Sequence, residues 1–186
     1  MTNTPQRVEF DADDLDTQRR RVGPWLTTVA TLQTAFREML GDTVPLVTDP
    51  LARSWLLGML ETARQHERAV DDLFAAFDLS PVAPSPVTAV AGAVLGRARE
   101  LLGHVEGVLA GATRGAAWRN LRKLQLANLD ALSGFAVAES FGLALARPRA
   151  VEISYAVQGQ KTQDQLLLRE LFLEFATDAV LYRGDI

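Results

Sequence analysis

Polar side chains that interrupt the apolar stripes of predicted helices are the residues of this chain that could do chemistry. Burying such a group without a partner costs free energy, so each one needs a physical reason. Carboxylates and a histidine from several helices can hold iron or manganese inside a helical bundle, since these cations bind several oxygen and nitrogen ligands. The candidate metal ligands are Glu139, Glu174, Asp178, His66 and Glu67, and two neutral amides, Gln33 and Asn128, lie on the same stripes.

Catalysis without a metal has little basis in this sequence. The chain has no cysteine, which excludes thiolate nucleophiles and thiolate metal sites. Its two histidines are His66 and His104, and neither is close in sequence to a serine in a nucleophile motif. No glycine-rich phosphate-binding loop follows a predicted strand. The sequence therefore predicts no catalytic residue and no cofactor.

Helical periodicity dominates the organisation of the chain. Apolar residues recur at a spacing of about 3.6 residues, and no segment shows the alternating pattern of a strand. We expect an all-α protein, an antiparallel four-to-five-helix bundle. A flexible N-terminal tail, 1–20, precedes the bundle, 21–186. The expected helices cover 22–40, 50–78, 87–110, 116–146 and 162–182, with a short helical or irregular piece at 150–157.

The stripes also predict which way individual residues face. Glu174 and Asp178 are four apart, on the face of the last helix that carries Leu171. Glu61 is expected to face outward from the second helix. The fourth helix is apolar nearly all round after Gln125, which predicts that it is buried on all sides.

Composition and charge narrow the range of partners. A net charge of −4 and a pI of about 5.2 argue against nucleic acid as a partner. A basic patch with an aromatic residue leaves nucleic-acid or membrane-surface binding as a minor alternative to a solvated helix start. The sequence shows no signal peptide and no membrane-spanning run, so we expect a cytoplasmic protein. The patch consists of Arg114, Arg119, Arg122 and Lys123, with Trp118 among them.

Three stretches resemble the YciF-like branch of the ferritin-like superfamily, whose members are stress-associated bundles of largely unknown function. LETARQHER at 60–68 resembles the L-E-T-x-x-Q-x-x-R stretch of that family. QLANLDALSGF at 125–135 is similar to its Q-x-x-E-H-x-E-x-x-G-Y stretch. Residues 166–181 look like its C-terminal stretch, with Glu174 and Asp178 at matching acidic positions.

The chain departs from this family pattern at the positions expected to bind metal. Asn128, Leu129 and Ala131 stand where the family has Glu, His and Glu, and Leu173 replaces the first of two paired glutamates. The resemblance therefore implies a ferritin-like bundle whose metal site is degenerate. We expect a non-catalytic, stress-associated structural or interaction protein, a homodimer with an unknown protein partner.

Two alternatives stay open from the sequence. The five candidate ligands could bind iron or manganese, at a complete or reduced site, and support oxidase or peroxide-detoxifying chemistry. Glu174 and Asp178 could instead be structural and pair with a basic residue. The basic candidates are Arg122, Arg169 and Lys161.

Overall fold

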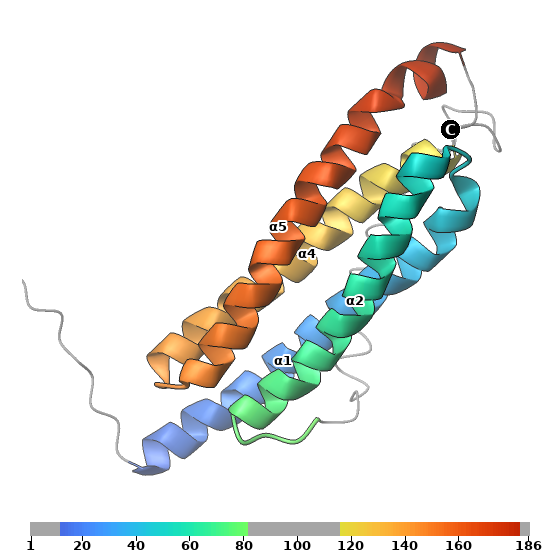
Figure 1. Ribbon diagram of the computed structural model, residues 1–186. Coiled ribbons are helices and arrows are strands. Elements are labelled where there is room, and N and C mark those ends of the chain that lie inside the picture. The colour runs from blue at the N-terminus through green and yellow to red at the C-terminus, as the bar shows by residue number, and fades with distance from the viewer. Residues whose placement is uncertain (1–11, 82–115, 183–186) are drawn as a thin grey trace, which may run out of the picture.

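The computed structural model describes residues 12–81 and 116–182, and every regular element in them is helical (Figure 1). The predicted all-α class is confirmed. The predicted helix at 87–110 and His104 lie outside the described residues. The elements are α1 (Ala12–Thr43), the 3-10 helix η1 (Val44–Leu46), α2 (Pro50–Ala76), α4 (Ala116–Ala144), α5 (Pro148–Glu174) and the π-helix η2 (Asp178–Tyr182).

Helix α1 begins ten residues before the predicted start at 22. Residues 12–20, assigned above to a flexible tail, form its first turns. Aspartates near the helix start interact favourably with its dipole, and Arg19 forms an ion pair of 2.7 Å with Asp16 one turn earlier. Arg19 also contacts Asp78 beyond the end of α2 at 3.4 Å, which ties these turns to the bundle.

Helix α2 matches its predicted bounds closely. Asp49 caps its N-terminus, since its carboxylate accepts a 2.7 Å hydrogen bond from the backbone N–H of Ala52, and Pro50 takes the first helical position. The helix ends two residues before the predicted end, and Asp78 then adopts a left-handed φ of 54°.

Helices α4 and α5 differ in how well the sequence predicted them. The expected helix at 116–146 corresponds to α4, whereas the expected break after 157 is wrong, because α5 runs unbroken from Pro148 to Glu174. Gly159 has open space around the position of an added Cβ, so it lies on the outer side of α5 and leaves the packed face continuous. Helix α4 is not buried on all sides as predicted, since Leu126, Leu129 and Leu143 are exposed.

Two contacts fix the relative direction of α2 and α4. Arg147, just after α4, pairs with Asp78, just after α2, at 2.8 Å, so these two helices end at the same end of the bundle. The indole N–H of Trp118 donates a 2.9 Å hydrogen bond to the carbonyl of Phe172, which places the start of α4 at the other end. Helices α2 and α4 are therefore parallel (Figure 1).

Two separate apolar clusters fill the core. The Phe36 cluster lies toward the start of α4, and the Phe135 cluster lies toward its end. Polar residues separate the two clusters on every helix. The Phe36 cluster contains Phe36, Leu40, Val44, Val47, Ala52, Leu56, Met59, Ala63, Ala117, Leu121, Leu124, Ala127, Leu168 and Leu171. The Phe135 cluster contains Val22, Leu26, Val29, Val70, Leu73, Phe74, Phe77, Phe135, Ala138, Ala150, Ile153 and Val157.

The stripes of the first two helices account for nearly half of these residues. The inward positions expected in the first two helices, from Val22 to Leu40 and from Leu56 to Phe77, are buried or half-buried. None of the described helices combines the length and the hydropathy needed to cross a membrane.

Candidate functional site

The five predicted metal ligands do not converge. His66 is buried in the core, but the carboxylate of Glu67 turns to the α1–α2 surface and accepts a 2.8 Å hydrogen bond from Nε of Arg37. The carboxylate of Glu139 accepts a hydrogen bond of 2.5 Å from the side-chain amide of Gln158 on α5.

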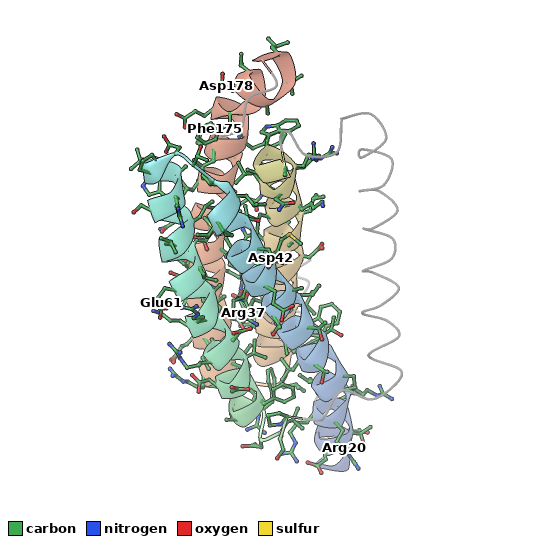
Figure 2. All side chains as sticks on the ribbon, turned by 90° about the vertical axis from the view of Figure 1, so that its right-hand side faces the viewer. Arg20, Arg37, Asp42, Glu61, Phe175 and Asp178 are labelled. Carbon is green, nitrogen blue, oxygen red and sulfur yellow. The ribbon has the colours of Figure 1, made fainter. Side chains whose placement is uncertain are left out.

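The other two predicted ligands lie at one end of the molecule. Glu174 is the last residue of α5 and Asp178 the first of η2, and both are exposed rather than on the apolar face. Figure 2 shows Asp178 at the end of the bundle, far along the axis from Arg37, which contacts Glu67. Among the described residues, no three His, Asp or Glu side chains are arranged to hold a metal ion.

A different set of polar residues meets in the core, and we call it the core layer. Each helix contributes at least one member, at the point where its stripe passes from one apolar cluster to the other. All of its side chains are almost fully buried. The core layer consists of Gln33 on α1, His66 on α2, Asn128 on α4, and Lys161 and Asp164 on α5.

Lys161 is the central residue of the core layer, with a side chain that is 0% exposed. Its ammonium nitrogen lies 4.3 Å from the centroid of the Phe36 ring, where a cation–π contact is possible. Its one hydrogen-bond acceptor is Oδ1 of Asn128 at 3.4 Å, which is a long contact. Burial lowers the pKa of Lys161 to about 7, although the nearby Asp164 carboxylate acts to raise it.

Asn128 holds this arrangement in register. Its Nδ2 donates to the backbone carbonyl of Lys161 at 2.8 Å and to Oε1 of Gln165 at 3.0 Å. Both amide hydrogens are then used, so Oδ1 faces the Lys161 ammonium. The predicted inward position of Asn128 is confirmed, and its role is to bind α5 to α4.

Asp164 is the only carboxylate of the core layer. Its Oδ1 accepts a 3.1 Å hydrogen bond from Nε2 of Gln160, and its Oδ2 is buried without a hydrogen-bond partner. Burial raises the pKa of Asp164, while Gln160 and Lys161 act to lower it. The neutral acid is thus favoured more strongly here than in water.

His66 and Gln33 complete the core layer. The imidazole of His66 packs edge-on against Phe135, with ring centroids 6.4 Å apart, and its Nδ1 has no hydrogen-bond partner. Burial first, and Lys161 second, lower the pKa of His66 to about 4. Nε2 of Gln33 donates to the carbonyl of Ala63 at 2.9 Å, which leaves its Oε1 without a partner. The predicted inward position of Gln33 is confirmed.

This arrangement can bind protons but has no access for a substrate. The core layer contains an amine, an imidazole and a carboxyl group, which all exchange protons. The most exposed of its members, His66, has only 6% of its surface accessible. Nucleophilic attack by Lys161 on a bound substrate would need space beside its amine, and the Phe36 ring and Asn128 lie there instead.

Iron or manganese does not fit the residues of the core layer. Such a centre needs several anionic oxygen ligands, but Asp164 is the only one in the core layer. The outward direction predicted for Glu61 is confirmed by its 3.0 Å pair with Arg64, so this residue adds no ligand (Figure 2).

Sequence reasoning missed Lys161 and Asp164 as core residues. Lys161 was considered as a possible partner for Glu174 and Asp178, and the structure places it in the bundle centre instead. The spacing of the buried α5 residues, alternately four and three, was the available signal. It runs through Ala150, Ser154, Val157, Lys161, Asp164, Leu168 and Leu171.

The aromatic residue of the basic patch is already engaged in the bundle. Trp118 stacks on Phe172 with ring centroids 4.7 Å apart, so one face of its indole ring is already covered. No family model, curated protein or solved structure matches this chain in comparisons with known proteins.

Proposed function

We propose that the protein is a metal-independent bundle of the ferritin-like kind that acts as a structural or interaction protein, without catalysis. The observation that carries this proposal is the burial of Lys161 between α1, α4 and α5. In the metal-binding bundles a cation joins the helices through their inward carboxylates. Here the amine of Lys161 lies in the centre of the bundle instead of a metal cation, and the amides of Gln33 and Asn128 take inward positions instead of carboxylates.

The ligand chemistry of the core layer supports this proposal. Its hydrogen bonds connect side chains to backbone carbonyls of neighbouring helices, from Gln33 to Ala63 and from Asn128 to Lys161. These bonds set the register of the helices without any ion. A buried polar contact of this type is best attested as a device for specificity of packing.

The interaction role is supported by the outer surface of the described helices. Large apolar side chains are exposed on three of them, and contact with another protein would remove this apolar surface from water. We propose a homodimer or a complex with another protein, in the cytoplasm, with the stress association that the family resemblance implies. The exposed apolar residues on α2, α4 and α5 include Leu51, Trp55, Leu126, Leu129, Leu166 and Leu173.

The test is the metal affinity of protein purified without chelator. Elemental analysis after addition of Fe²⁺ or Mn²⁺ and removal of free ions should find no stoichiometric metal, and chelator should leave the thermal unfolding midpoint unchanged. Binding of one or two ions per chain that is abolished by Glu174→Gln would contradict the proposal. It would instead favour the alternative function, a metal-dependent oxidase. Glu61→Gln, an exposed change on α2, is the matched control.

Light scattering on the same sample tests the interaction part. A dimer that dissociates when Leu166 is replaced by Glu would support it. If the protein remains a monomer at high concentration, the homodimer hypothesis is wrong. The proposed interaction would then be with a different protein.

A further inference from the structure

We propose that the core layer is a proton-binding joint, in which proton uptake by Lys161 weakens the packing between the Phe36 cluster and the Phe135 cluster. The bundle would then loosen at this level as the solution changes from mildly alkaline to neutral. This inference goes beyond the proposed function, because it concerns protons rather than metals or partners.

The first step is the poor compensation of a charge at Lys161. An ammonium group has three N–H donors. Here one acceptor is available at 3.4 Å and one aromatic face at 4.3 Å. No described carboxylate forms an ion pair with Lys161, although Asp164 lies one turn away on the same helix. A buried charge without a close counter-ion is strongly destabilising, because its lost hydration is not replaced.

The second step is the nature of the groups that face Lys161. Helix α1 presents Phe36 and Gln33, which are uncharged, and α4 presents Asn128, also uncharged. Helix α2 presents His66, which would repel a charged Lys161 if it were protonated. On α5 itself, Asp164 is the only acidic neighbour.

The charged residues just outside the core layer do not alter this balance. The Arg37 guanidinium lies one position beyond Phe36 but is paired with Glu67 at the surface. Glu139 accepts from Gln158 and does not contact Lys161. Within the described part of the chain, Asp164 is thus the one group that can offset a proton on the amine, and burial favours the neutral form of Asp164 as well.

The third step is the location of the core layer between the clusters. On each of the four long described helices a polar residue lies between the members of one cluster and those of the other. Three buried polar atoms there have no partner in the folded protein. Water would satisfy them if the helices separated slightly, which lowers the cost of local opening. These atoms are Oε1 of Gln33, Nδ1 of His66 and Oδ2 of Asp164.

The direction of the pH effect follows from the pKa of each group. Burial lowers the pKa of Lys161 from 10.5 to about 7, so between these values the unfolded chain binds a proton that the folded chain does not. The free energy of unfolding therefore rises with pH across this window and is lowest near and below pH 7. The pKa of His66, lowered from 6.5 to about 4, extends the loss of stability into acid. The raised pKa of Asp164 acts in the opposite direction, from 3.8 upward.

The presence of only two lysines in the chain makes a direct test possible. Full-length protein labelled with ¹⁵N at the lysine side chains gives one signal from exposed Lys123 and one from buried Lys161. We expect the Lys161 signal to titrate with a midpoint near 7. A midpoint above about 9.5, close to the ordinary value for lysine, would overturn the proposal. This measurement needs no variant.

The effect on folding is tested with Lys161→Met, which keeps the length of the side chain and removes the amine. In the native sequence, urea unfolding should show a folding constant that rises close to tenfold per pH unit from about pH 7 to 9. Lys161→Met should abolish that dependence, whereas Lys123→Met should retain it.

Hydrogen exchange then locates the effect within the bundle. At pH 7 the amides of Ala63 and Ala131, which adjoin the core layer, should be better protected in Lys161→Met than in the native sequence. The proposal would be contradicted if these amides were equally protected in Lys161→Met and in the native sequence. It would also be contradicted if the folding constant of Lys161→Met kept the same dependence on pH. If Lys161→Met does not fold, the lysine titration of the native sequence decides alone.

Discussion

The two ends of the bundle are built differently, although the same four helices form both. The end at the Phe135 cluster is packed with phenylalanines, and Asp78 ties it to α1 and to the turn before α5 through Arg19 and Arg147. The end at the Phe36 cluster is rich in leucine and alanine and exposes Leu51 and Trp55. The difference is that ion pairs through Asp78 close the Phe135 end, whereas apolar side chains are exposed at both ends, Leu143 at the closed end and Leu51 and Trp55 at the other.

The largest expected effect comes from removing an aromatic residue of the closed end. Phe135 is fully buried, and its replacement by Ala should lower the free energy of unfolding by about 3–5 kcal/mol. Leu124→Ala in the Phe36 cluster should cost about 2–5 kcal/mol. Denaturant titration measures both, with Leu143→Ala at an exposed site as the control. If Phe135→Ala lowered the free energy of unfolding by less than Leu124→Ala, the Phe135 end would not be the more strongly stabilised of the two.

A smaller effect is expected where α4 meets α5 at the closed end. A Cβ added at Gly142 would lie 2.9 Å from Cγ2 and 3.1 Å from the backbone nitrogen of Val151. Gly142→Ala should therefore destabilise the protein by about 1–3 kcal/mol, because the helices must separate. Gly159→Ala on α5 has open space and should stabilise by about 0.5–1 kcal/mol. If thermal unfolding gave the same shift for both, close approach would not be the reason for Gly142.

The smallest effect concerns the ion pairs at the same end. Asp78 is more than half exposed, so its pairs with Arg19 and Arg147 contribute little, and Asp78→Ala should cost only about 1 kcal/mol. Part of that cost comes from its left-handed φ of 54°, which alanine tolerates poorly. Asp78→Gly should cost less than Asp78→Ala. Unfolding at high salt separates the two causes, since salt weakens the ion pairs alone.

The fold was largely predictable from the sequence, since it depends on patterns repeated along whole helices. The stripes of α1 and α2 and the cap at Asp49 each follow from local rules. The break expected in α5 was wrong because Gly159 and its polar neighbours weaken a helix locally, whereas packing of Val157 and Lys161 against the other helices maintains it.

The candidate site was less predictable, because it depends on which polar residues the helices bring together. Gln33 and Asn128 were identified, since each interrupts an apolar stripe. Lys161 was missed because a lysine usually marks the solvent-facing side of a helix. Glu174 was predicted to lie on the packed face of the last helix, but α5 ends at this residue and its side chain is exposed.

The parallel course of α2 and α4 has a consequence for how the chain folds. α1 and α2 are joined by residues 44–49, and α4 and α5 by 145–147, so each pair is a hairpin with contacts local in sequence. Contacts between the hairpins join distant residues, as in the hydrogen bond from Trp25 to Gly134, 109 positions apart. Local contacts form sooner than distant ones. We therefore expect the two hairpins to form first and the core layer to assemble when they dock, as the last step of folding.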